Sequence, residues 1–346
     1  MSHEPQSLTQ VRRCSLAVDL GAARTRVYLK SGGLIVDAPS VVAVDARTGG
    51  LIAAGTRAAR MEGRTPDYIR VQHPVVGGTV TDVATAQRML RALIGTKLRR
   101  AWHRRPLLRA AVCVPNEAEP VARRAAVDTL AGIGARHVEL VETPIAAGVG
   151  CGLPVEQPEA TMILVCGATS TQVAVVALGA VVAAERVPMG GDTVHAAVRQ
   201  HLRNRYELVL PSQSVMPLEL SLYGSAGDHL TDMEIDGRDV VTGRVRRVRV
   251  DAEEMRQAAR APLTALMDAV RAVLLRCPPD LVADLAERGM NLVGGSAQLA
   301  GLESGLRQHT GMPVRVAEEP SLCPVRGLAA LIEGQVRPMG LEPVPS

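Results

Sequence analysis

The chain has 346 residues, of which 47% are hydrophobic and 21% charged, with a mean hydropathy of +0.12. This composition fits a well-buried protein and excludes wholesale disorder. No apolar run reaches the ~18–20 residues of a membrane span. The length favours two domains. The net charge of +4 comes almost entirely from arginine, and with one Trp, four Tyr and no Phe the chain offers few aromatic faces on which a nucleic acid could stack, so we expect no nucleic-acid partner.

The first half of the chain predicts alternating strands and helices. Its start, MSHEPQSLTQVRR, has no apolar core, so we expect no signal peptide and a cytoplasmic protein. Residues 15–30 predict strand, glycine turn and strand, because the apolar run LAV precedes the alternating RVYL. The elements expected next are a strand pair around a TGG turn (38–55), a helix (82–102), a strand ending at Pro115 (109–115), a helix capped by Asn116 (116–135), a strand (137–144) and a small-residue helix (145–153).

The second half repeats this pattern. Residues 162–176 predict another strand–turn–strand unit, followed by a third strand. The elements expected after it are a helix with Asp192 near its start (190–206), a polar insert (206–252), two helices (251–277 and 279–289), a strand–turn–helix unit (290–311) and a last strand (313–320). Two similar α/β halves predict a cleft between them that both hairpin turns face, which is the architecture of a two-domain phosphate clamp.

The cysteines indicate a reduced, structural role. They are far apart in the sequence, lack C-x-x-C spacing and lie mostly in apolar stretches, where a thiol packs as a small hydrophobic side chain. We therefore expect no metal site at the six positions, which are Cys14, Cys113, Cys151, Cys166, Cys277 and Cys323.

Several stretches in the right order resemble one family over about residues 14–330. They are AVDLGAARTRVYLK, APSVVAV, GRTP (63–66), CVP (113–115), CGLP (151–154), GGD (190–192), CPP (277–279), ERGM (287–290), MNLVGGSAQLAGLESGL and TGMPVRVAEEP (310–320). On these motifs the chain resembles the MreB family of bacterial actin-like, cell-shape cytoskeletal proteins.

The resemblance implies an α/β protein of the actin-like fold, with two duplicated domains of four subdomains around a cleft that holds ATP and magnesium. It implies domain I over residues 1–147 with a small insert at about 34–66, domain II over 148–325 with an insert at about 206–262, and a C-terminal segment, 326–346, that returns to domain I. It also implies filaments of this chain, or of this chain with a related actin-like protein, on the inner face of the cytoplasmic membrane, where they organise cell-wall synthesis proteins.

The first phosphate loop keeps only part of the family pattern. By resemblance, Asp19 helps to place the waters of the metal ion and Gly21 lets the backbone approach phosphate. Where the family usually has Thr-Ala-Asn, this chain has Ala22, Ala23 and Arg24. Arg24 is open to two interpretations, a phosphate contact or a solvent-facing turn residue.

The second loop departs further. The family pattern Asp-x-Gly-Gly-Gly-Thr-Thr corresponds to residues 165–171, where the acid is replaced by Val165, the first glycine is kept as Gly167, and the other two become Ala168 and Thr169. Because Ala and Thr do not readily adopt the positive φ that Gly allows, we expect a loop that no longer opens its N–H groups to phosphate. Val165 offers magnesium no ligand.

The other family positions are mixed. Thr143 stands where the family has the Glu that orients the attacking water, and a hydroxyl cannot act as a base near neutral pH. The residues that the resemblance places beside the base and the ribose are Gly294, Gly295, Ser296, Ala297 and Gln298, and Pro217, Leu218, Glu219 and Leu220 in place of Glu-Arg-Ile-Lys. Because the losses gather in one pocket, our hypothesis is a degenerate site that binds ATP and magnesium weakly at best and hydrolyses very slowly or not at all.

Two basic stretches have both a bland and a specific interpretation. Trp102 lies among Arg99, Arg100, Arg104 and Arg105, which suits either a membrane anchor or a solvated loop with Trp102 tucked against the core. Residues 243–250, GRVRRVRV, favour a solvated strand over a phosphate-binding or nucleic-acid-binding one.

Three rivals to the degenerate filament protein stay open: an active ATP-hydrolysing filament protein of the same family, a non-polymerising scaffold, and a sugar-kinase-like enzyme on the same fold. The last needs a carboxylate base aimed at a hydroxyl, and the cleft motifs supply none beyond Asp19.

Overall fold

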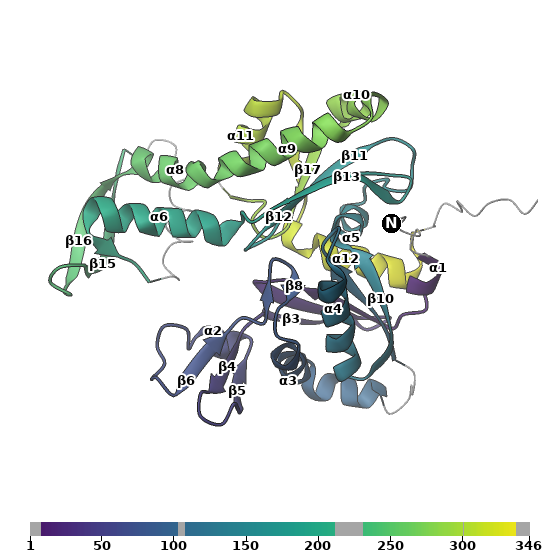
Figure 1. The fold of residues 1–346 in the computed structure, drawn as a ribbon, viewed down its shortest axis with the longest axis horizontal. Coiled ribbons are helices and arrows are strands. Elements are labelled where there is room, and N and C mark those ends of the chain that lie inside the picture. The colour runs from purple at the N-terminus through teal and green to yellow at the C-terminus, as the bar shows by residue number, and fades with distance from the viewer. Residues whose placement is uncertain (1–7, 103–107, 212–230, 300, 337–346) are drawn as a thin grey trace, which may run out of the picture.

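The protein folds into two α/β lobes, as a computed structural model shows (Figure 1). The structure describes residues 8–102, 108–211, 231–299 and 301–336. Among these, no helix combines the length and apolar character needed to cross a membrane.

Lobe I is built on a five-stranded sheet in the order β10-β9-β1-β2-β3. Its strands are β1 (Leu16–Leu20), β2 (Arg24–Leu29), β3 (Gly33–Pro39), β9 (Leu108–Val114) and β10 (Ala135–Glu142). β9 and β10 run parallel to β1, whereas β2 and β3 form an antiparallel meander beside it. Helices α3 (Val83–Trp102) and α4 (Pro120–Gly132) cover this sheet, and its core includes Val18, Leu90 and Leu130, all fully buried.

Two small β units extend lobe I between β3 and α3. The first is a three-stranded sheet in the order β5-β4-β6 with a short helix, made of β4 (Val42–Asp45), β5 (Leu51–Ala54), α2 (Thr56–Ala59) and β6 (Ile69–Gln72). The second is the hairpin of β7 (Val75–Val76) and β8 (Thr79–Val80), whose turn is Gly77–Gly78. Neither β6 nor this hairpin is among the elements expected from the sequence.

Lobe II repeats the sheet of lobe I, in the order β13-β12-β11-β17-β18. Its strands are β11 (Thr161–Cys166), β12 (Thr171–Ala177), β13 (Ala180–Val187), β17 (Met290–Val293) and β18 (Val314–Val316). The helices on it are α6 (Gly191–Tyr206), α9 (Thr264–Arg276), α10 (Pro279–Arg288) and α11 (Leu302–Thr310). A small sheet of β14 (Leu208–Val209), β15 (Asp232–Asp239) and β16 (Val245–Asp251) projects from it with α8 (Ala252–Arg260), and both small sheets lie on the same side of the molecule (Figure 1).

The duplication extends to the register of the strands. In lobe I, Leu20 pairs with Thr25 across the first hairpin, and in lobe II Cys166 pairs with Thr171 across the second. Each hairpin is flanked by a parallel strand on one side and an antiparallel strand on the other. The predicted duplication is confirmed, and it assigns every position of the first loop a counterpart in the second.

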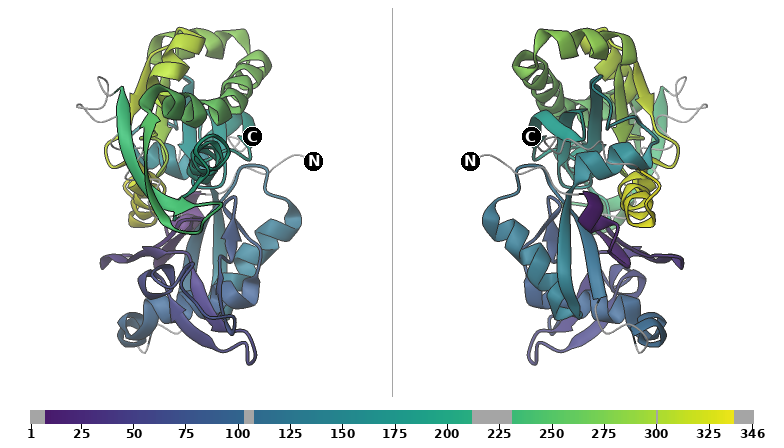
Figure 2. Two further views of the ribbon diagram at one scale, coloured as in Figure 1. Left: turned by 90° about the vertical axis from the view of Figure 1, so that its left-hand side faces the viewer. Right: turned by 90° about the vertical axis from the view of Figure 1, so that its right-hand side faces the viewer.

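Helices α5 (Thr143–Gly150) and α12 (Cys323–Glu333) cross between the lobes, as Figures 1 and 2 show. A Cβ on Gly150 would lie 1.9 Å from the Cys323 carbonyl oxygen, and one on Gly327 would lie 1.6 Å from that of Ala146. α12 is not among the helices expected from the sequence. It packs Leu328, Leu331 and Ile332 against lobe I, so we propose that the segment returns to domain I; the boundaries 147/148 and 325/326 stay predictions.

Three predicted helices differ from the structure. The helix expected from Asn116 begins at Pro120, because proline suits the first helical position, where no N–H is needed. The helix expected over 251–277 is broken near Pro262, which cannot donate a helical hydrogen bond, into α8, a 3₁₀ turn and α9. α3 has a break at Gly95, whose φ is 48° and ψ −135°.

The crossing of α5 and α12 predicts that Gly327→Ala destabilises the protein by about 3 kcal/mol or more, because the new methyl overlaps the Ala146 carbonyl and neither backbone can yield without moving a lobe. Urea unfolding measures it. Gly305→Ala in α11 is the matched control: its nearest neighbour is Met267 Cε at 3.4 Å, so the helical preference for Ala makes it neutral or stabilising. Equal midpoints for the two variants would contradict this account of the crossing.

Candidate functional site

Each of the two phosphate-type loops closes with the same backbone hydrogen bond. Gly21 N–H donates to the Arg24 carbonyl at 3.1 Å, and Gly167 N–H donates to the Ser170 carbonyl at 3.0 Å. A Cβ on either glycine would lie within 2.7 or 2.8 Å of that carbonyl oxygen, so both positions need glycine for space. No residue of 21–24 or 167–170 has a positive φ. The second loop therefore closes with no positive φ at Ala168 or Thr169, and the expectation that it no longer opens its N–H groups to phosphate stays a prediction.

Asp19 is buried at the end of β1 and is paired within the protein. Its Oδ2 lies 3.8 Å from Arg26 Nη1, and Arg26 Nε lies 3.2 Å from Asp37 Oδ1. These three residues are opposite one another on β1, β2 and β3. Burial raises the pKa of Asp19 to about 6; the Arg26 guanidinium lowers it and the Asp37 carboxylate raises it. Asp19 thus belongs to an ion-pair row along the sheet.

The remaining residues of the first loop are fixed by hydrogen bonds with Asp37 of β3 and with Ser40, which follows it. Arg24 Nε donates to Asp37 Oδ1 at 2.7 Å and Nη2 to the Asp37 carbonyl at 3.1 Å, so its guanidinium is turned onto β3. Ser40 supports the backbone of the loop, because its N–H donates to the Ala23 carbonyl at 2.9 Å and its hydroxyl to the Gly21 carbonyl at 2.6 Å. Ala22 adds no polar group.

The corresponding row of lobe II has different chemistry. Val165, Gln172 and Arg186 lie opposite one another on β11, β12 and β13, at the positions that correspond to Asp19, Arg26 and Asp37. Val165 is buried in an apolar cluster. Gln172 is 7% exposed, and its Oε1 accepts the Asn116 N–H from lobe I at 3.0 Å. The row in lobe II therefore has no carboxylate.

Thr169 contacts the other lobe. Its Oγ1 accepts the Gly77 N–H, in the turn of the β7–β8 hairpin, at 2.7 Å. The loop is fixed on its own side as well, because the Gly167 and Ala168 carbonyls accept the N–H groups of Gly191 and Asp192 at 3.2 and 2.8 Å.

The loop predicted to lie beneath the base is tied to the second phosphate loop. Gly294 has φ 90° and its N–H donates to the Pro320 carbonyl at 2.7 Å, while the Ser296 N–H donates to the Cys166 carbonyl at 3.0 Å. Ser296 Oγ accepts the Gly191 N–H at 3.2 Å, and Gly295 has open space where a Cβ would stand. A hollow of about 380 Å³ begins here, lined by Ala297, Gln298, Leu299, Gly301, Glu303, Ser304, Arg307 and Val316. Pro217, Leu218, Glu219 and Leu220 lie outside the described residues.

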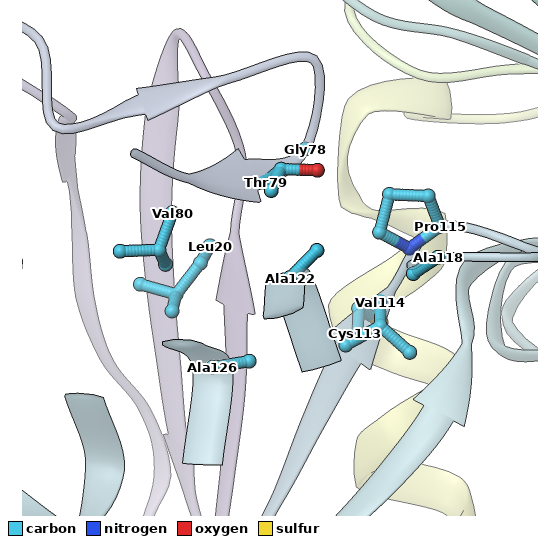
Figure 3. Close-up of a pocket in the computed structure, with 10 residues that line it drawn as sticks. All are labelled: Leu20, Gly78, Thr79, Val80, Cys113, Val114, Pro115, Ala118, Ala122 and Ala126. Atoms are coloured by element: carbon cyan, nitrogen blue, oxygen red, sulfur yellow. The ribbon is translucent and has the colours of Figure 1, made fainter. Parts of the chain in front are cut away.

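Thr143 is the first residue of α5, directly after β10. Its hydroxyl donates to the Val114 carbonyl at 2.9 Å, which commits its only proton to the end of β9. Beside this strand end is a hollow of about 10 Å³ lined by Leu20, Gly78, Thr79, Val80, Cys113, Val114, Pro115, Ala118, Ala122 and Ala126 (Figure 3). It is mostly apolar and has room for one water at most, so it holds no substrate.

The sequence did not reveal several residues that contact the predicted ones or lie in the same rows, through side chains or, for Gly77 and Asn116, through backbone N–H groups. These are Arg26, Asp37, Ser40, Gly77, Asn116, Gln172 and Arg186. For Arg26 a signal existed: Asp19 and Arg26 are equally far from the centre of the predicted hairpin, so strand pairing places them opposite each other.

The two basic stretches are described to different extents. Arg99, Arg100 and Trp102 belong to the end of α3, where the side chains are not described, and Arg104 and Arg105 lie outside the described residues. The second stretch is β16, as predicted. Its arginines pair with the acids of β15, in the ion pairs Arg246–Asp239, Arg247–Asp236 and Arg249–Asp232 at 2.7, 2.7 and 2.6 Å.

The duplicated lobes and their paired loops define an actin-like protein. The structure matches the crystal structure of MreB5 of Spiroplasma citri bound to AMPPNP with a TM-score of 0.83 and 25% identity, covering 90% of this chain and 93% of that one. It matches the MamK double helical filament with a TM-score of 0.72 at 19% identity, over 92% of this chain and 98% of that one. The predicted fold class is thereby confirmed.

The sequence matches identify the family. The family model described as MreB/Mbl protein matches residues 13–338. The cell shape-determining protein MreB of Escherichia coli K12 is 37% identical over 324 residues, which are 92% of this chain and 93% of that protein. Mbl of Bacillus subtilis 168 is 30% identical, over 92% of this chain and 95% of that protein. The chain belongs to the MreB/Mbl family of actin-like, cell shape-determining proteins.

The buried Asp19 predicts a pH effect on stability. Its raised pKa means that between about pH 4 and pH 6 the folded protein binds a proton that the unfolded chain does not. The free energy of unfolding therefore falls as the pH rises through this window, by up to about 1.4 kcal/mol per pH unit, and the contribution is constant above it. Asp19→Asn removes this slope, which urea unfolding at pH 4–8 measures as a wild-type-minus-variant difference.

Asp45→Asn is the matched control for this measurement. The backbone N–H groups of Arg47 and Thr48 hold the pKa of Asp45 below its usual range, so its stabilisation is lost only as the pH falls below about 4. The difference between the wild type and Asp45→Asn should therefore be nearly flat from pH 4 to pH 8. A difference between wild type and Asp19→Asn that is flat from pH 4 to pH 6 would show that Asp19 is not desolvated.

Proposed function

We propose that this MreB/Mbl protein works by assembly, with an ATP site that binds nucleotide weakly and hydrolyses it very slowly or not at all. It forms or joins filaments at the inner face of the cytoplasmic membrane and organises cell-wall synthesis proteins there. The observation that carries the proposal is the difference between the corresponding rows of the two sheets. Asp19 on β1 is paired with Arg26, and its counterpart on β11 is Val165.

The donor set around the loops does not fit magnesium. A magnesium ion takes hard oxygen ligands or waters held by carboxylates. Asp19 already has the Arg26 guanidinium 3.8 Å from its carboxylate, and burial raises the pKa of that carboxyl, which favours its protonated form. Val165 supplies no oxygen, and within the described ranges no three His, Cys, Asp or Glu side chains gather. We therefore assign no step to a metal ion.

The water-activating position supports the same proposal. Thr143 has no carboxylate, and its hydroxyl donates a hydrogen bond to the Val114 carbonyl. Loss of one general acid–base group commonly costs ~10²–10⁴ in rate, and here the metal ligand is absent as well.

The second candidate is an active ATP-hydrolysing filament protein. The solved MreB5 structures of Spiroplasma citri are described as bound to AMPPNP and to ADP. This chain keeps Asp19, Gly21, Gly294 and Gly295 at the corresponding predicted positions, which favours some residual nucleotide binding. The scaffold and sugar-kinase rivals have no such specific support.

The test compares the wild type with Thr143→Glu/Val165→Asp, which restores both carboxylates. We expect phosphate release by the wild type at least ~10²-fold below that of the restored variant, and Mg²⁺-dependent tightening of ATP binding only in the variant. Thr143→Gln/Val165→Thr, of similar shape without charge, is the matched control. Micromolar Mg-ATP binding by the wild type with turnover like that of active relatives would refute the proposal.

We further propose that the stretch around Trp102 anchors the filament to the membrane. An indole at headgroup depth and basic residues near anionic lipid suit this role, each basic residue adding about 1 kcal/mol. Trp102→Ala with Arg99, Arg100, Arg104 and Arg105 changed to Gln should lose binding to vesicles that contain anionic lipid, as measured by co-sedimentation. Arg247→Gln, on the ion-paired strand β16, should bind like the wild type. Unchanged binding of the Trp102 variant would exclude this anchor.

A further inference from the structure

We propose that the second phosphate loop has become a clasp, in which Thr169 and Gln172 of lobe II bind backbone N–H groups of lobe I and hold the cleft closed without a nucleotide. The clasp consists of Gly77, Asn116, Thr169 and Gln172. It does not require that hydrolysis be lost, because its contacts are made by the chain alone.

Two hydrogen bonds form the clasp. Gly77 N–H donates to Thr169 Oγ1 at 2.7 Å, and Asn116 N–H donates to Gln172 Oε1 at 3.0 Å. Both donors are in loops of lobe I, one in the β7–β8 turn and one after β9, and both acceptors are side chains of lobe II. Gly77 and Gln172 are buried, so water competes poorly for these bonds.

The turn at Gly77 fits closely against lobe II. Gly77 has φ 59°, and a Cβ there would lie 2.3 Å from Arg186 Nη2 and 3.8 Å from Ser170 Oγ. Gly78 has φ 72°, and a Cβ there would lie 3.3 Å from Pro115 Cγ of lobe I. The turn thus needs glycine for its backbone and for its contact with β13.

The acceptor side of the clasp is rigid. The carbonyls before Thr169 accept N–H groups from Gly191 and Asp192, and a Cβ on Gly190 would lie 2.4 Å from the Ala168 carbonyl oxygen. Thr169 is β-branched, so its hydroxyl has few rotamers available. A fixed loop and a stiff side chain present the oxygen to Gly77 at little entropic cost.

A second approach of the lobes lies beside the clasp. His73, next to the β7–β8 hairpin, and Glu62 both act electrostatically on Asp192 at the start of α6. Burial raises the pKa of Asp192, His195 and His73 lower it, and Glu62 raises it. Charges from both lobes therefore meet within range of one carboxylate.

The clasp depends on a side chain that the resemblance does not place here. The family pattern has glycine at position 169, and glycine offers no side-chain acceptor. The change from glycine to threonine thus gives the loop an acceptor aimed at the opposite lobe.

The test is residue-resolved amide hydrogen exchange on the full chain, first without nucleotide. We expect the Gly77 and Asn116 amides of the wild type to exchange at least tenfold more slowly than unprotected amides. Thr169→Val keeps the shape of the side chain without its hydroxyl and should speed Gly77 exchange at least tenfold. Thr169→Ser keeps the hydroxyl and should restore most of the protection.

The Gly191 amide, which donates to the Gly167 carbonyl within lobe II, reports that the loop stays folded in each variant. Unprotected Gly77 in the wild type would overturn the clasp, and that measurement needs no variant to fold. Gly77 exchange unchanged by Thr169→Val, with Gly191 still protected, would overturn it too. Repeating the experiment with Mg-ATP separates the clasp from the proposed degenerate ATP site. Tight ATP binding with turnover would refute the degenerate site alone. Protection of the Gly77 and Asn116 amides that appears only with ATP would refute the clasp alone.

Discussion

The crossing of α5 and α12 is the constraint on which the rest of the structure depends. Gly150 and Gly327 allow the two helices to touch backbone to backbone, and a single added carbon at either position would overlap a carbonyl group. Since α5 follows β10 directly and α12 packs under lobe I, this contact sets how the two sheets meet. The contacts of Thr169 with Gly77 and of Gln172 with Asn116 depend on this arrangement of the two lobes.

The two lobes have the same strand pairing but different side chains at the corresponding positions. The rows Asp19–Arg26–Asp37 and Val165–Gln172–Arg186 occupy corresponding positions of duplicated sheets. The first row places one guanidinium between two carboxylates, and the second has an amide and a guanidinium but no carboxylate. The closing hydrogen bond of each loop is unchanged, which separates what the fold needs from what metal and phosphate chemistry would need.

The sequence predicted the strands of both hairpins because alternation and buried apolar runs are local signals. It did not reveal α12, whose segment CPVRGLAALIE begins with Cys-Pro and is rich in small residues, so that packing against α5 dictates the helix more than any capping signal does. Asn116 was predicted as a helix cap from its residue type, whereas its N–H serves a contact with Gln172, 56 positions away. The partner of Thr169 is 92 positions away, and no local pattern specifies such a pair.

The strength of the clasp decides what it can do. The two neutral hydrogen bonds, both partly buried, contribute about 0.5–1.5 kcal/mol each, or roughly 1–3 kcal/mol together. A bias of that size shifts an equilibrium between open and closed lobes by about 5- to 150-fold. The clasp makes the closed state the ground state wherever the lobes without it prefer the open state by less than this bias. A ligand or a neighbouring subunit that prefers the open state by a few kcal/mol reverses it. In a nucleotide-driven clamp the bridging groups are phosphate oxygens that leave with the ligand, whereas the bridging groups of the clasp are side-chain oxygens that stay.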